Sequence, residues 1–229
     1  MKRWIVGCLS MLILMVAPIG AAAQEPDAFD GAFGVRSVAV LAETYVKCLI
    51  DAMHVMTATD EMKSGDWTRM KPLLAQFEES ELSYNAWFLR PDGSYYKVAT
   101  DLATANLADR TYFPRVMSGE TTLGDLVLSR STGRKSMVLT APVDVGGQII
   151  GALGVTLYLD DFSNLLNSKL QFPAGISFYA HNEIGEISLH TNPARLLEPI
   201  ASAAVQLMPG GLEVTEFLGW TFVLGTNEP

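Results

Sequence analysis

The sequence contains few cysteines, and this limits how the fold can be held together. Only two of the 229 residues are cysteines, and Cys8 lies within an N-terminal segment that has the features of a secretory signal. Without that segment Cys48 has no intramolecular disulfide partner, so an ordinary hydrophobic core must stabilise the fold. Because Cys48 lies among apolar positions of a predicted helix, we expect a buried thiol. Pairing with a second molecule is the alternative.

Metal ligands and catalytic motifs are also lacking. The histidines, His54, His181 and His190, are far apart and have no metal-ligand spacing, so we expect no metal site and no cofactor. The sequence has no G-x-S-x-G elbow, phosphate loop or G-x-G-x-x-G fingerprint. We therefore expect no enzyme activity. A hydrolase would require Ser129 or Ser131 to meet a histidine and a carboxylate in space.

Basic residues are in the minority. The chain has 16 Lys and Arg against 25 Asp and Glu, a net charge of −9 at pH 7 that becomes −11 if the signal with Lys2 and Arg3 is removed. This balance argues against nucleic acid and anionic lipid surfaces as partners.

The first 23 residues are typical of a secretory signal peptide. Lys2 and Arg3 precede the mostly apolar run 4–19, and three alanines stand before Gln24. We expect export across the inner membrane to the periplasm, with cleavage after Ala23. An uncleaved inner-membrane anchor facing the periplasm is the alternative. No second long apolar run follows, since 220–224 is too short to cross a bilayer.

Two helices are predicted after a flexible leader at 24–34. Apolar residues recur at three- and four-residue spacing from Val35 to about Met62, which is typical of an amphipathic helix. The segment 64–66 interrupts the pattern, and 67–79 is predicted as a second helix with Asp66 as its N-cap.

Strands dominate the rest of the chain. The patterns predict about five strands in a first unit, a helix at 160–170, and four strands around a helix at 193–207 in a second unit. The expected strands are 84–89, 95–99, 126–129, 136–142, 148–159, 176–180, 186–190, 212–217 and 220–225. We predict an α+β fold with a long N-terminal helix and two antiparallel sheets, a main module at 35–170 and a smaller one at 171–229.

The segment NLADRTYFPRVMSG, residues 106–119, is the best candidate for a binding site. It places Arg110 beside Tyr112 and Phe113, before the strands that follow. A guanidinium offers a planar fork of donors, and aromatic walls lower the local dielectric and strengthen a charge-assisted pair. This combination favours a pocket for a carboxylate. A local salt bridge between Asp109 and Arg110 is the alternative.

Residues 35–229 resemble the Cache family of extracellular sensor domains. The resemblance rests on the hairpin FLRPDGSYY, on NLADRTYF, on SRSTGRKSMVLTAPV and on GQIIGALGVTLYLDDFSNLL, with GEISLHTNP and LGWTFVLG in the second unit. It implies a double form with two PAS-like modules, the second shortened, and a ligand pocket in the first. Family members usually lie between two membrane helices of chemoreceptors, histidine kinases or cyclic-dinucleotide enzymes. This chain is expected to be a free-standing exported form.

The resemblance also implies site residues. In amino-acid-binding members an arginine and nearby aromatics hold the carboxylate, and Arg110, Tyr112 and Phe113 match these. The positions of a tyrosine and an aspartate that hold the ammonium are occupied by Ala105 and Thr156. Without the aspartate carboxylate, the binding free energy of a ligand with an ammonium group would be weakened by about 2–5 kcal/mol. We therefore expect a small organic acid or another small anionic metabolite.

Further candidates lie on the predicted strands. Trp87 and Thr140 are on strands of the same sheet, and Tyr95 and Tyr96 point to opposite faces, so at most one lines a pocket. Of these two tyrosines, we predict that Tyr96 lines the pocket.

We expect a sensor acting in signal transduction, such as chemotaxis, through a membrane receptor or kinase. An interaction module with a vestigial pocket is the alternative, and in either case a homodimer through the N-terminal helix is an open possibility.

Overall fold

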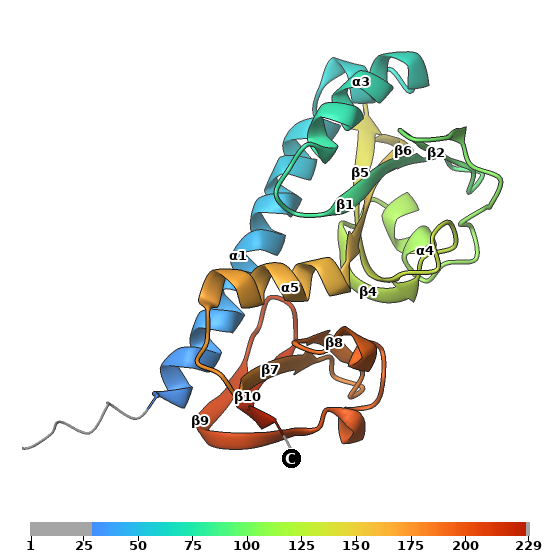
Figure 1. The fold of residues 1–229 in the computed structure, drawn as a ribbon. Helices are drawn as coiled ribbons and strands as arrows, with labels where there is room; N and C mark the ends of the chain where they lie inside the picture. The colour runs from blue at the N-terminus through green and yellow to red at the C-terminus, as the bar shows by residue number, and fades with distance from the viewer. Residues whose placement is uncertain (1–28, 228–229) are drawn as a thin grey trace, which may run out of the picture.

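Two modules share one long helix. The structure is a computed structural model that describes residues 29–227. Helix α1 (Gly31–Thr57) runs along both modules, with a six-stranded sheet against its C-terminal half and a four-stranded sheet against its N-terminal half (Figure 1). Both sheets are antiparallel, and the second is the smaller. The predicted α+β class is confirmed.

Helix α1 begins four residues earlier than the sequence pattern indicated. Asp30 caps it by accepting hydrogen bonds from the backbone N–H groups of Ala32 and Phe33. The predicted leader 24–34 is therefore too long, because Gly31 and Gly34 belong to the helix. A side chain at Gly31 would collide with the Pro209 carbonyl, so its lack of one allows close packing on the second module. The predicted signal peptide and residues 24–28 lie outside the described residues.

The helix also ends earlier than expected. It stops at Thr57, and a separate short helix α2 (Asp60–Lys63) precedes α3 (Trp67–Glu78), which Asp66 caps as predicted. The prediction for Cys48 is wrong, because its side chain is exposed. The inward stripe of α1 passes through Val46, Leu49 and Met53 and leaves Cys48 on the outer side.

The first sheet has one strand more than predicted. Its order is β3-β2-β1-β6-β5-β4. The strands are β1 (Tyr84–Leu89), β2 (Tyr95–Lys97), β3 (Asp101–Leu102), β4 (Thr122–Leu128), β5 (Lys135–Val145) and β6 (Gln148–Tyr158). The added strand is β3, which is only two residues long and has no alternating pattern to reveal it.

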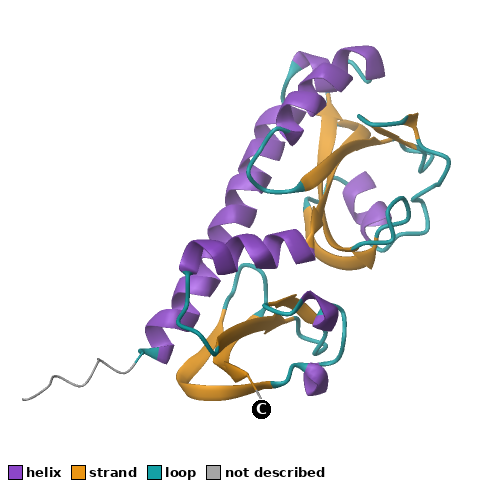
Figure 2. Ribbon diagram, viewed as in Figure 1, coloured by secondary structure: helices purple, strands orange, loops and turns teal. Residues whose placement is uncertain are grey.

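The two faces of this sheet pack against different helices. Alternation along β1 sends Ala86 and Phe88 into the core beneath α1, whereas Trp87 and Leu89 join a smaller apolar cluster with Tyr112 of helix α4 (Tyr112–Met117). Figure 2 shows α1 and α4 on opposite sides of the sheet. The face toward α4 is the one that carries the candidate site.

The second module differs from the prediction at its helix. Strands β7 (Ile176–His181), β8 (Ile187–His190), β9 (Val205–Val214) and β10 (Thr221–Asn227) form a sheet in the order β8-β7-β10-β9. The predicted helix 193–207 is replaced by two short 3₁₀ turns, Pro193–Arg195 and Ile200–Ser202, and by the start of β9. This strand begins seven residues before the predicted strand 212–217 and ends three residues before its predicted end. Leu197 and Ala204 have positive φ angles, which an α-helix cannot contain.

Helix α5 (Leu159–Leu170) connects the modules and crosses α1 (Figure 1). Its Phe162 is fully buried and meets Tyr45 of α1 edge-on, with ring centroids 6.2 Å apart. The helix ends where Gln171 adopts a left-handed conformation, and we propose this point as the module boundary. No helix within 29–227 is both long and apolar enough to span a membrane.

Candidate functional site

A recess lies between α4, the sheet face beneath it and the turn after β4. Its cavity volume is about 30 Å³, within about 430 Å³ of empty space that includes the part open to solvent. The lining residues are Asn85, Trp87, Tyr95, Lys97, Leu107, Arg110, Tyr112, Val127, Ser129, Arg130, Ser131, Val138 and Thr156. Strands β1, β2, β5 and β6 supply one wall, and the loop leading into α4 supplies Leu107 and Arg110.

Arg110 lies at this recess with donor capacity to spare. Its Nη2 donates to the backbone carbonyl of Leu128 at 3.1 Å, while its Nε is buried and has no hydrogen-bond partner among residues 29–227. The alternative of a salt bridge with Asp109 is wrong, because Asp109 forms a two-pronged ion pair with Arg130. A buried N–H without an acceptor is costly, and an anionic ligand would satisfy it.

Trp87 forms the floor of the recess. Its indole lies directly over Gly154, where any side chain would overlap the ring, and its Nε1 donates to the hydroxyl of Thr156 at 2.9 Å. The missing side chain at Gly154 therefore makes room for the indole. The hydroxyl of Thr156 already accepts this hydrogen bond inside the protein.

Two phenol groups complete the wall. Tyr95 and Tyr112 are buried, and each ring packs against Trp87, with centroids 5.9 and 6.1 Å away. Burial raises the pKa of both hydroxyls, and the nearby charges of Arg110 and Arg130 lower each pKa by smaller amounts. Both groups stay protonated at neutral pH. Neither hydroxyl has a hydrogen-bond partner within the described chain, so both can donate to a ligand.

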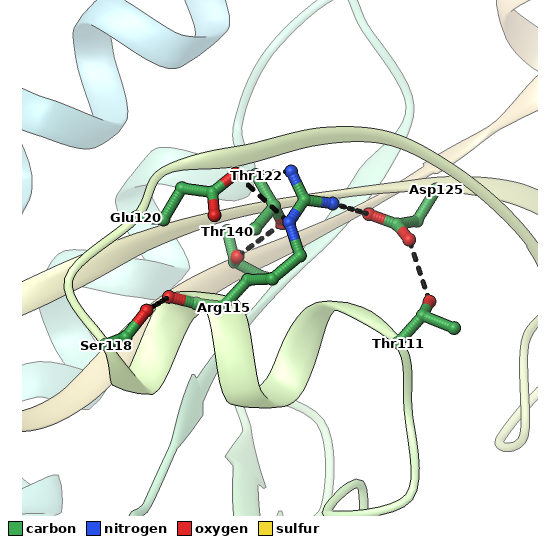
Figure 3. A network of polar contacts seen from close by, with 7 residues as sticks. All are labelled: Thr111, Arg115, Ser118, Glu120, Thr122, Asp125 and Thr140. Atoms are coloured by element: carbon green, nitrogen blue, oxygen red, sulfur yellow. Dashed lines mark hydrogen bonds and ion pairs between the residues drawn. The ribbon is translucent and has the colours of Figure 1, made fainter.

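A polar network holds α4 on β4 (Figure 3). Thr111 Oγ1 donates to Asp125 Oδ1 at 2.8 Å, and Arg115 pairs with Glu120 and, at 3.8 Å, with the other oxygen of Asp125. Because Arg110 directly precedes Thr111, this network positions the loop that carries the guanidinium.

The charge of the lining has one sign. Among the described lining residues, Lys97, Arg110 and Arg130 are the only ionisable side chains apart from the tyrosines, and none is aspartate or glutamate. The site is therefore suited to an anion and has no counter-charge for an ammonium group.

Comparison with solved structures places this arrangement among known folds. The ligand-binding domain of the Pseudomonas aeruginosa amino acid chemoreceptor PctC, solved with GABA, matches with a TM-score of 0.65 and 15% identity over 85% of this chain and 96% of that one. The sensor domain of the Vibrio cholerae histidine kinase DctB matches with a TM-score of 0.61 and 12% identity, again over 85% and 96%. The fold is that of the Cache-type extracellular sensor domains.

Another Cache-type match is the ligand-binding domain of the Pseudomonas fluorescens chemoreceptor CtaA, solved with L-serine. Its TM-score is 0.63 at 13% identity, over 85% of this chain and 94% of that domain. No protein-family model matches the sequence. Comparison with curated proteins also finds no match. These matches span nearly the whole of each solved domain and give no sign of a shortened second module, so that expectation stays a prediction.

The structure brings four of the seven predicted site residues to the recess of this Cache fold: Arg110, Tyr112, Trp87 and Thr156. The remaining three, Phe113, Tyr96 and Thr140, are not part of its lining. Phe113 is half-buried and packs against the apolar cluster under α4. Its neighbour Tyr112 takes the position facing the recess, since adjacent helical residues point in different directions.

Tyr96 and Thr140 are placed differently from the prediction for separate reasons. Tyr96 lies on the opposite sheet face and stacks on Trp67, with ring centroids 5.1 Å apart. Thr140 is on the correct face but is fully buried, and its hydroxyl pairs with that of Thr122 at 2.7 Å (Figure 3). Alternation predicts the sheet face on which a strand residue lies, and only packing decides whether that residue reaches the recess or is buried beside it.

Sequence reasoning missed Tyr95, Lys97 and Asn85 as lining residues. In the hairpin of β1 and β2, Lys97 lies opposite Trp87, and strand alternation places Tyr95 and Asn85 on the same face. The predicted hairpin could therefore have identified these three residues.

The triad alternative is not assembled in the described residues. None of the three histidines contacts Ser129 or Ser131. His54 pairs with Thr121, and His181 with the carbonyl of Asn182. His190 is buried and bonded to the backbone of Ala203 and Asn192. Residues 29–227 also contain no group of acidic, histidine or cysteine side chains that could hold a metal ion.

Proposed function

We propose that this chain is an exported sensor protein that binds a small carboxylate in the recess and acts through a membrane receptor or kinase. The observation that carries the proposal is the buried Nε of Arg110, which has no partner within the described part of the chain, in a recess whose described lining holds cations and no carboxylate. The Cache-type fold supports it. Export to the periplasm belongs to the same proposal. Cell fractionation tests export, and sequencing the N-terminus of the exported protein distinguishes its two forms. Gln24 would indicate cleavage after Ala23, and Met1 would indicate an uncleaved anchor.

An acid without an ammonium group suits this recess better than an amino acid. An α-ammonium would lie beside the uncompensated cations Arg110 and Lys97 and would meet no carboxylate among the described lining residues, and Thr156 is already bonded to Trp87. Removing one partner of a desolvated charge pair costs about 2–5 kcal/mol. GABA and L-serine are ligands of the chemoreceptor domains that resemble this chain, and charge distinguishes this recess from one built for a zwitterion.

Replacing Arg110 by glutamine should weaken binding of the organic acid by about tenfold or more, because a charge-assisted hydrogen bond contributes about 1.5–3 kcal/mol. The measurement is isothermal titration of acids and amino acids that first raise the melting temperature of the wild type in a saturable way.

Arg69→Gln is the matched control for this prediction. Arg69 is an exposed arginine of α3 with no side-chain contact to the recess, so its variant should bind as the wild type does. If no acid stabilises the wild type, or if both variants bind equally well, the proposed ligand class is wrong.

The outer face of α1 supports a homodimer, and also the second candidate function of an interaction module. Phe33 and Val40 are 71% and 58% exposed and line an apolar groove with Leu41 and Leu170. Burying such a patch is favourable. We expect Val40→Glu to shift the protein from dimer to monomer in sedimentation experiments, while Val145→Glu, at the far end of β5, leaves the dimer intact. A wild type that stays monomeric at high concentration would contradict this.

A further inference from the structure

Lys97 is a second uncompensated cation at the recess. It lies on β2 opposite Trp87 of β1 and lines the same wall as Tyr95. Arg130, the third cation, is neutralised by Asp109 and also donates to the carbonyl of Asn106. Within the described residues Lys97 has neither an ion pair nor a side-chain hydrogen bond. Two positive charges, on Arg110 and Lys97, are therefore left for a ligand.

A second recess adjoins the first at Lys97. It is lined by Tyr95, Lys97, Thr100, Leu102, Ala103, Thr104, Ala105, Arg130 and Ser131, and its empty space, including the part open to solvent, is about 710 Å³. Four of these residues, Tyr95, Lys97, Arg130 and Ser131, also line the first recess. The two recesses therefore adjoin along these shared residues and together are called the groove; Arg110 lines the first recess and Lys97 lines both.

The charges along this groove select the ligand more narrowly than Arg110 alone. A monocarboxylate would neutralise Arg110 and leave Lys97 beside it without a partner. A ligand with a positive second group would be repelled by Lys97. We propose that the ligand is a short dicarboxylate, with one acid group on Arg110 and the phenols and the other on Lys97. This inference rests on the proposed function, since it assumes that Arg110 holds a carboxylate.

The test compares each diacid with its own half-amide. Succinate, glutarate and adipate and their half-amides differ in one charge at nearly equal size. Each is titrated calorimetrically at pH 7.5 and fixed ionic strength into the wild type, Lys97→Gln and Arg110→Gln. Lys63→Gln serves as the control, because Lys63 is an exposed lysine at the end of α2 that lines neither recess.

We expect at least one diacid to bind the wild type about tenfold or more tightly than its half-amide. Lys97→Gln should reduce that ratio to about two- or threefold while leaving the affinity for the half-amide nearly unchanged, because only one charge pair is lost. Lys63→Gln should leave all affinities as in the wild type.

The outcomes separate this inference from the proposed function. If diacid and half-amide bind the wild type equally, or Lys97→Gln weakens both equally, the dicarboxylate inference fails while an Arg110-dependent carboxylate site stands. If none of the six compounds and no monocarboxylate binds the wild type, or if Arg110→Gln binds them unchanged, the proposed function fails as well.

Discussion

Replacing Phe162 by alanine should lower the free energy of unfolding by about 3–5 kcal/mol. Phe162 is fully buried on α5, where this helix meets Tyr45 of α1 at the junction of the two modules. Truncation removes apolar contacts and leaves a cavity that two helices and two sheets cannot easily close. Urea unfolding monitored by circular dichroism measures the loss.

A milder variant keeps this prediction testable if Phe162→Ala does not fold. Phe162→Leu keeps much of the volume and should cost less than half as much. Ile184→Ala is the control, because Ile184 is 85% exposed and its truncation should change stability by no more than about 0.5 kcal/mol. Equal losses for Phe162→Ala and Ile184→Ala would show that the junction is not a tightly packed core.

Gly154→Ala should both destabilise the protein and deform the recess. An added Cβ would lie 2.2–2.3 Å from three carbons of the Trp87 indole, which has to move out of its position. Such overpacking costs about 1–3 kcal/mol. Movement of the ring also breaks the hydrogen bond from Trp87 to Thr156. Urea unfolding and the NMR signal of the Trp87 indole N–H measure the two effects.

A double variant tests the cause of this effect. In Trp87→Phe the smaller ring leaves room for the new methyl group, so adding Gly154→Ala should then cost less than it does in the wild type. The difference between the two costs is the coupling energy, expected to be about 1 kcal/mol or more. Independent, additive costs would mean that the indole does not fill the space over Gly154.

Local signals predicted much of this fold. The N-cap Asp66 and strand β1 (Tyr84–Leu89) are where the sequence put them, because a cap and a bounded alternating run depend on neighbouring residues only. The helix predicted at 193–207 is wrong, because a local apolar spacing does not reveal where the backbone is interrupted. Its apolar residues have a helix-like spacing, but Pro199 and the positive φ of Leu197 interrupt the backbone.

The sequence by itself determined most of the strands, the N-cap Asp66, and the presence of an arginine among aromatics before a sheet, since each depends on residues close together in the chain. Only the tertiary structure decided which residues share the recess. Pairing of β1 with β2 brings Lys97 and Tyr95 to it, whereas Thr140 is fully buried and its hydroxyl pairs with that of Thr122 on β4. The pairing of Asp109 with Arg130, 21 positions apart, likewise leaves Arg110 and Lys97 as the free charges. Such contacts between distant residues depend on three-dimensional packing, which no local pattern encodes.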